Sequence, residues 1–215
     1  MDSSKSAHSD QGLKSLLTKA WVYKLFQTIV RRKHNKRRLV QEFIQPFAKC
    51  RILDIGCGPA DIVAYLPDSI DEYLGVDINF KYIEHARQRW RDRATCTFLC
   101  QRVDEMPQPQ VGAYDIVLAV AIVHHLNDSD ARCLFDVAYR SLSSKGVLIT
   151  YDPVFQENQH WLAKWLISKD RGKSVRTVEG YKMLAAEYFE QIESIVLHDT
   201  LKVPYTICLM KCRKE

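Results

Sequence analysis

The sequence predicts an α/β fold, in which a mostly parallel sheet carries helices on both faces and follows an N-terminal helical segment. From residue 50 onward, short apolar runs alternate with amphipathic stretches of helical period, which is the pattern of successive strand–helix–strand units. In addition, two glycines, Gly56 and Gly58, come directly after the first apolar run. Sheets of this class bind ligands at that position, beyond the carboxyl ends of the strands.

The composition is that of a globular protein large enough for one domain. Hydrophobic residues fill 47% of the 215 positions and charged residues 27%, and no apolar run approaches the ~18 residues of a membrane-spanning helix. The first residues are polar and lack the apolar core of a secretion signal. Seven cysteines without a C-x-x-C pair argue against a disulfide framework or a metal site. Free thiols and a cytoplasmic location are therefore expected.

Apolar side chains at helical spacing predict that the chain is helical from Leu13 to about Phe47, after a tail over residues 1–11. Within this stretch, residues 31–38 hold six lysines or arginines in eight positions. The basic run predicts a solvated surface, or a docking site for an anionic acceptor, acidic lipid headgroups or nucleic acid. Nucleic acid is disfavoured because the chain has no recognisable aromatic stacking platform.

Seven apolar runs are predicted as strands and five amphipathic stretches as helices. The strands are expected at residues 50–55, 72–77, 96–100, 114–120, 146–152, 191–198 and 205–212. The helices are expected at about residues 60–66, 79–92, 129–141, 158–168 and 177–188. A short link joins the last two strands, so they should pair as an antiparallel hairpin on an otherwise parallel sheet.

The glycine turn can be compared with the two ligands that such turns commonly hold, a dinucleotide and S-adenosylmethionine. A dinucleotide site needs G-x-G-x-x-G, but Asp61 stands where the third glycine belongs. Its negative charge in the first helical turn opposes a pyrophosphate, and Pro59 removes a backbone N–H from the loop. S-adenosylmethionine has no phosphate and carries an ammonium and a sulfonium, so a carboxylate such as Asp54 favours it.

Asp77 ends the second predicted strand, 21 residues after Gly56. A carboxylate at that position can accept hydrogen bonds from both ribose hydroxyls of a nucleoside ligand. Dinucleotide enzymes use the same arrangement, so Asp77 does not decide between the two ligands. The alternative is that Asp77 only caps the following helix.

Four motifs, LDIGCGPA, YLGVDIN, YDIVLAVAIVHHL and LSSKGVLITYDP, resemble in order and spacing those of class I S-adenosylmethionine-dependent methyltransferases of the small-molecule type. The resemblance covers about residues 50–151. It implies a Rossmann-like, seven-stranded, mostly parallel sheet with a reversed last strand, and S-adenosyl-L-methionine as the cofactor. The residues it assigns to the methionine portion, the ribose and the adenine are Asp54, Gly56, Cys57, Gly58, Ala119, Val120, Asp77 and Ile78.

The same resemblance implies a helical lid over residues 12–48, with Tyr23, Phe26 or Gln27 facing the pocket. Residues 49–215 would then form the methyltransferase domain, in which residues 152–188 are an insertion that shapes the acceptor pocket. The adenine-edge motif departs from the family, because Arg102 replaces the expected acid. Either Asp104 contacts the exocyclic amine, or the backbone of Val103 alone reads the adenine edge.

Three residues beyond the fourth and fifth strands are candidates for acid–base chemistry, namely His124, His125 and Asp152. Each has a structural alternative: one histidine bonds the backbone while the other is exposed, and Asp152 is a turn residue before proline. A base is not required, because positioning alone can supply ~7–11 kcal/mol of a displacement barrier. Trp161 and Trp165, spaced i, i+4, predict either a packed helix face or a shelf for substrate stacking.

These observations predict a cytoplasmic enzyme that methylates an oxygen or nitrogen of a small molecule, or of a soluble precursor of a glycoconjugate or lipid. The acceptor could be anionic, and peripheral membrane contact could come through residues 31–38. Two alternatives stay open: a nicotinamide-dependent oxidoreductase, and a non-catalytic scaffold that binds S-adenosylmethionine.

Overall fold

The computed structural model describes residues 33–102, 105, 112–169, 172–198 and 204–214. The predicted tail and most of the predicted lid lie outside these residues, including Tyr23, Phe26 and Gln27. Val103 and Asp104 also lie outside them.

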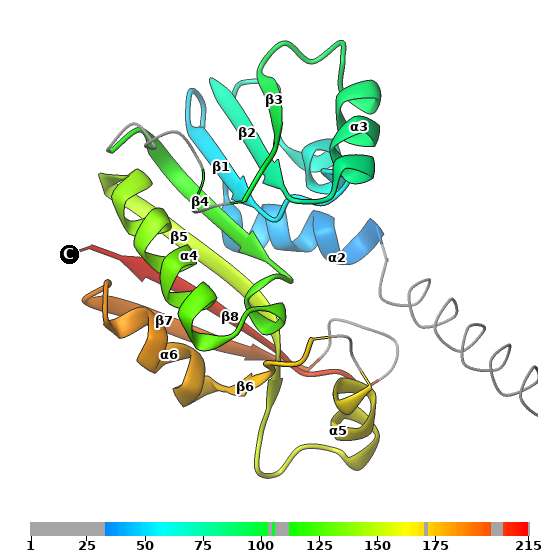
Figure 1. The fold of residues 1–215 in the computed structure, drawn as a ribbon, viewed down its shortest axis with the longest axis vertical. Helices are drawn as coiled ribbons and strands as arrows, with labels where there is room; N and C mark the ends of the chain where they lie inside the picture. The colour runs from blue at the N-terminus through cyan, green and yellow to red at the C-terminus, as the bar shows by residue number, and fades with distance from the viewer. Residues whose placement is uncertain (1–32, 103–104, 106–111, 170–171, 199–203, 215) are drawn as a thin grey trace, which may run out of the picture.

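A single twisted sheet forms the centre of the described structure (Figure 1). Its main path runs β3-β2-β1-β4-β5-β8-β7, with a short β6 paired to β5. The strands are β1 Arg51–Ile55, β2 Glu72–Asp77, β3 Cys96–Cys100, β4 Tyr114–Val120, β5 Leu142–Phe155, β6 Arg176–Thr177, β7 Gln191–Leu197 and β8 Ile207–Arg213. Only β8 runs antiparallel to its neighbours, β5 and β7. The predicted parallel sheet with a reversed last strand is confirmed.

Helices cover both faces of the sheet, so the core is split into two apolar layers (Figure 1). One layer holds side chains from α2–η1, η2, α3 and α5, and the other holds side chains from α4 and α6. The helices are α2 Lys33–Arg38, η1 Leu39–Ile44, η2 Asp61–Tyr65, α3 Phe80–Arg89, η4 Val123–His125, α4 Asp128–Ser141, α5 Trp161–Ser168 and α6 Val178–Ala186.

The described end of the predicted lid, α2 and η1, is part of the core. Leu39, Val40 and Ile44 are buried against the sheet in the first layer. The helix ends at Ile44, where Gln45 takes a left-handed conformation with φ of 50° just before Pro46. Burial of these three side chains fixes the helix on the sheet.

The structure differs from the prediction in two strands and one helix. β5 begins at Leu142, earlier than predicted, because residues 143–145 are polar and gave no apolar signal. β6 is only two residues long, too short for any periodicity to appear. The helix expected at 60–66 is a single 3₁₀ stretch, η2, which begins after Ala60 in a left-handed conformation and ends just before Pro67.

Candidate cofactor and acceptor site

The glycine turn joins β1 to η2 and is held against the end of β2. The backbone N–H groups of Gly56 and Cys57 both donate to the carbonyl of Val76. Gly56 has φ of 74°, and a Cβ there would collide with the side chain of Ile122. Gly58 has φ of 55° but faces open space. The first glycine is thus required both by its conformation and by packing, and the second by conformation alone.

Asp54 lies beneath this turn, with its side chain in the interior. It is 3% exposed, and its Oδ2 accepts a 2.5 Å hydrogen bond from the hydroxyl of Tyr73. Burial raises the pKa of Asp54 to about 6, although the Tyr73 hydrogen bond opposes the shift. Cys57 is also turned inward, and burial raises the pKa of its thiol. Asp54 therefore supports the turn from below and titrates near neutral pH.

Asp61 does not leave a free negative charge in front of η2. Its carboxylate pairs with Lys36 at 2.7 Å and also with Arg89, and these cations lower its pKa against the opposing effect of burial. The charge argument against a phosphate ligand is therefore weaker than the sequence indicated. The argument now rests on the geometry of η2, because a five-residue 3₁₀ helix preceded by Pro59 offers few aligned N–H groups.

Asp77 is held in one orientation at the end of β2. One carboxylate oxygen accepts from the N–H of Gly58 at 2.9 Å and the other from the N–H of Asn79 at 2.8 Å. The side chain of Asn79, not that of Asp77, caps α3 by accepting from Lys81 and Tyr82. The capping alternative for Asp77 is therefore wrong, and its carboxylate keeps further lone pairs for a ligand.

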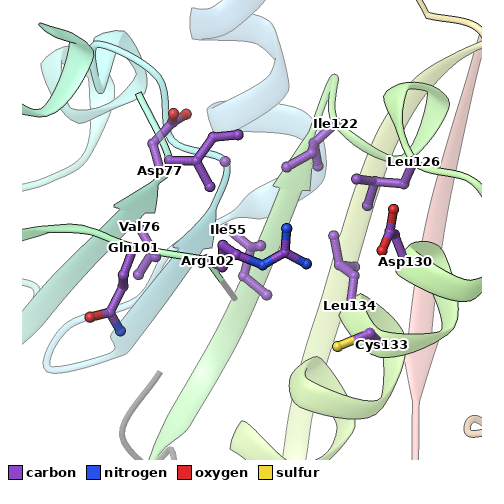
Figure 2. Close-up of a pocket in the computed structure, with 12 residues that line it drawn as sticks. Ile55, Val76, Asp77, Gln101, Arg102, Ile122, Leu126, Asp130, Cys133 and Leu134 are labelled. Carbon is purple, nitrogen blue, oxygen red and sulfur yellow. The ribbon is translucent and has the colours of Figure 1, made fainter. Parts of the chain in front are cut away.

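A hollow opens beside Asp77 between the ends of β1, β2 and β4 and the start of α4 (Figure 2). It is lined by Ile55, Gly56, Val76, Asp77, Ile78, Gln101, Arg102, Ile122, Leu126, Asp130, Cys133 and Leu134. Its walls are mostly apolar, and Ile78 at its edge is 74% exposed, which suits contact with a flat ring.

Arg102 extends into this hollow, where Figure 2 shows its guanidinium between the two walls. Its Nε lies 4.0 Å from the carboxylate of Glu105. The family motif has an acid at this position, and this sequence has a cation instead. A guanidinium can stack on an aromatic base, so the departure is compatible with a nucleoside ligand.

The end of β4 forms the wall nearest the glycine turn. Ala119 is fully buried and its side chain is closed to a ligand, whereas Val120 is half-buried. Ala121, next along the chain, has a left-handed φ of 57°, and its N–H donates to the carbonyl of Tyr151 at 2.9 Å. Any contact from this wall would come from the backbone.

His124 and Asp152, from the ends of neighbouring strands, meet inside the protein. Nδ1 of His124 lies 2.7 Å from Oδ1 of Asp152, and the same oxygen accepts from the His124 backbone N–H at 3.1 Å. The two side chains are 4% and 2% exposed. Asp152 lies within β5 and pairs with Cys208 of β8, so the prediction of a turn aspartate is wrong. The pair fixes the turn after β4.

His125 faces outward from the same turn. It is exposed, and its ring lies 4.0 Å, centroid to centroid, from the ring of His124. The sequence could not tell which histidine is inside, because the 3₁₀ turn η4 sets the direction of both. Of the three predicted acid–base residues, only His125 is open to an acceptor.

Arg176 is a structural residue of the site that sequence reasoning missed. Its guanidinium donates to the carbonyls of Val123 and Leu126 and to the carboxylate of Asp128. These three acceptors lie on the segment that contains both histidines. No motif surrounds Arg176 in the sequence, so its role becomes visible only through these contacts.

Comparison with known proteins adds to this geometry. Residues 52–146 match the family model described as "Methyltransferase domain". Residues 52–146 are thus similar to a methyltransferase domain. The cofactor of this family is S-adenosylmethionine, and the matched segment includes the glycine turn, Asp77 and the turn with His124 and His125. Curated proteins gave no match to the sequence.

Solved structures share the fold of this chain at low sequence identity. A TehB-like S-adenosylmethionine-dependent methyltransferase from Corynebacterium glutamicum is 14% identical, with a TM-score of 0.62 over 92% of this chain and 97% of that one. The PH0226 protein from Pyrococcus horikoshii is 18% identical, with a TM-score of 0.63 over 90% and 98%. The [4+2]-cyclase SpnF is 17% identical, with a TM-score of 0.59 over 74% and 58%. The fold alone therefore does not fix the reaction.

The described residues suit S-adenosylmethionine at this site. Asp77 presents an oriented carboxylate where a ribose would lie, and the exposed Ile78 adjoins the mostly apolar hollow. The short η2 lacks the dipole that a pyrophosphate would need. Within the described part of the chain, no cluster of His, Cys, Asp and Glu could hold a metal ion.

Proposed function

We propose that this protein transfers the methyl group of S-adenosylmethionine to an oxygen or nitrogen of a small molecule or of a glycoconjugate or lipid precursor. The observation that carries the proposal is the carboxylate of Asp77, which two backbone N–H groups orient at the edge of the hollow. Residues 152–188 and the N-terminal lid are proposed to complete the acceptor pocket. A cytoplasmic location, in keeping with seven free thiols, remains part of the proposal.

In this proposal the cofactor residues act by positioning. Asp77 holds the ribose hydroxyls, Ile78 contacts the adenine, and Arg102 lies over the hollow that receives it. When bound, S-adenosylmethionine supplies an electrophilic methyl group. The glycine turn and the backbone around Ala121 hold the reacting end, so that the acceptor can approach in line.

His125 is the residue best placed to accept a proton from the acceptor, because it is exposed at the rim. His124 has the different role of a positioning residue. Its ring is buried and its Nδ1 faces Asp152, so it fixes the turn from which His125 projects. An acceptor with a hydroxyl group needs such a base more than a free amine does, since a base contributes typically 10²–10⁴-fold.

The test uses purified full-length protein, S-adenosylmethionine labelled in its methyl group, and fractionated extracts that contain candidate acceptors. The expected result is a labelled product with equimolar S-adenosylhomocysteine, at a rate lowered by roughly 10²-fold or more in His125→Ala. His198→Ala, at an exposed histidine after β7, serves as the matched control and should keep full activity. Cofactor binding without transfer to any fraction would favour the scaffold alternative and overturn the proposal.

The nicotinamide alternative gains no support from the site. A dinucleotide would place its pyrophosphate at η2, where the geometry described above provides no adequate cradle. Reduction of a substrate with NADH, in the absence of methyl transfer, would revive it.

A further inference from the structure

We infer that the outer face of α5 docks on the surface of a bilayer that contains anionic lipids. Trp161 is 73% exposed and Trp165 is 48% exposed. The prediction that this pair packs in a helix face is therefore wrong. A contiguous exposed apolar patch on a protein surface commonly marks an interaction site.

The exposed residues of α5 form one stripe, composed of Trp161, Lys164, Trp165, Ser168 and, at the helix end, Lys169. At 100° per residue, these positions fall within about 140° of the helix circumference. The opposite side of α5 is anchored in the protein, where Ala163 and Ile167 are 2% and 1% exposed. The stripe is thus a fixed surface on an anchored helix.

The chemistry of the stripe selects the occupant. It combines two tryptophans with two lysines, and the sequence has no acidic residue from 158 to 169. Indole rings favour the region between lipid headgroups and acyl chains, while lysine extends its ammonium toward anionic headgroups. A bilayer surface with anionic lipids matches both features.

The basic run near the N-terminus is a weaker candidate for the same role. Of its described members in α2, Lys36 pairs with Asp61 and Arg38 pairs with Glu42 at 2.8 Å. These internal ion pairs occupy two of its charges, whereas Lys164 and Lys169 of the α5 stripe form no ion pair with any other described residue. Among the described helices, none is both long and apolar enough to cross a membrane.

The stripe also lies at a suitable place in the fold. α5 follows β5 directly and lies beyond the carboxyl end of that strand, away from α4 and α6 (Figure 1). Asp152 and His124 lie at this same end of the sheet. Docking through α5 would bring this rim of the sheet close to lipid. The acceptor pocket would then also lie near the bilayer, an inference that rests on the proposed function.

Vesicle co-sedimentation of the full chain tests the inference. Wild-type protein should bind vesicles of phosphatidylcholine with one-third phosphatidylglycerol. Its affinity for vesicles of pure phosphatidylcholine should be lower, by about fivefold for each lysine that contacts the anionic headgroups. Trp161→Ala/Trp165→Ala should lower binding by about tenfold or more, while Trp161→Phe/Trp165→Phe should retain part of it. Met183→Ala, at a 69% exposed apolar residue on α6, is the matched control and should bind as wild type.

The inference is overturned if wild-type protein does not bind the anionic vesicles, or if the double alanine variant binds as tightly as wild type. It is also overturned if only substitution of the exposed Arg37, in the basic run, removes binding. Thermal melting and S-adenosylhomocysteine binding of each variant show that it is folded. These readouts separate the two proposals, since vesicle binding requires no methyl transfer.

Discussion

Replacing Tyr73 with phenylalanine removes one oxygen atom and leaves the buried carboxylate of Asp54 without the hydrogen bond from that hydroxyl. The pKa of Asp54 is about 6 in the folded protein, above its ordinary value of 3.8. The folded state therefore holds this proton more tightly, and stability falls as the pH rises from about 4 to about 6. For a shift of roughly two pH units, that loss amounts to about 3 kcal/mol.

The cost of Tyr73→Phe should depend on the charge of Asp54. Below pH 5 the carboxyl is neutral, and losing a neutral hydrogen bond costs about 1 kcal/mol. At pH 8 it is ionised, and losing a hydrogen bond to a charged group costs about 1.5–3 kcal/mol. In a chain of this size, each kcal/mol moves the melting temperature by roughly 2–4 °C. The drop should thus be several degrees larger at pH 8 than at pH 5.

Tyr181→Phe is the matched control. The hydroxyl of Tyr181 is also buried, but it donates to the neutral carbonyl of Pro153 at 2.9 Å. Its loss should lower the melting temperature by the same amount at both pH values. If Tyr73→Phe also costs the same at pH 5 and pH 8, Asp54 does not titrate in this range and the reasoning is wrong.

Two further predictions compare paired substitutions. Gly56→Ala should destabilise the fold by several kcal/mol, because the added Cβ meets the side chain of Ile122. Gly58→Ala places its Cβ in open space and should cost only about 1 kcal/mol of backbone strain. Similar melting temperatures for the two variants would contradict the packing account. Arg176→Ala should lower methyl transfer about tenfold or more by releasing the turn after β4, while Arg132→Ala, which breaks an exposed ion pair with Glu187, should leave the rate unchanged. Equal rates for the two arginine variants would show that the turn needs no such support.

Most strands of the sheet could be predicted because each is a short apolar run, and the short link before the last strand predicted its antiparallel pairing. The start of β5 could not, because residues 143–145 are polar and lie in an irregularity of the ladder, between the Leu142–Tyr114 and Val147–Ile116 pairs. Local pattern predicted a helix at 60–66 but not its 3₁₀ geometry, nor the left-handed conformation of Ala60 before it.

For the site, sequence position predicted which strand ends carry His124 and Asp152, and neighbouring strand ends then bring the two together. Side-chain direction was not predictable, because it depends on tertiary contacts. His124 turns inward to Asp152 and packs against Gly172, while His125 turns outward. The pairing of Asp61 with cations from two other helices could not be read from the sequence for the same reason.

Calorimetric titration with S-adenosylhomocysteine, and separately with NADH, tests the central claim that the oriented carboxylate of Asp77 holds the ribose of a cofactor without a phosphate. S-adenosylhomocysteine should bind at one site per chain, and Asp77→Ala should weaken it by roughly 10–150-fold, the range for losing hydrogen bonds to a charged group. NADH should give no saturable heat. Saturable NADH binding that Asp77→Ala weakens, with no binding of S-adenosylhomocysteine, would contradict the account.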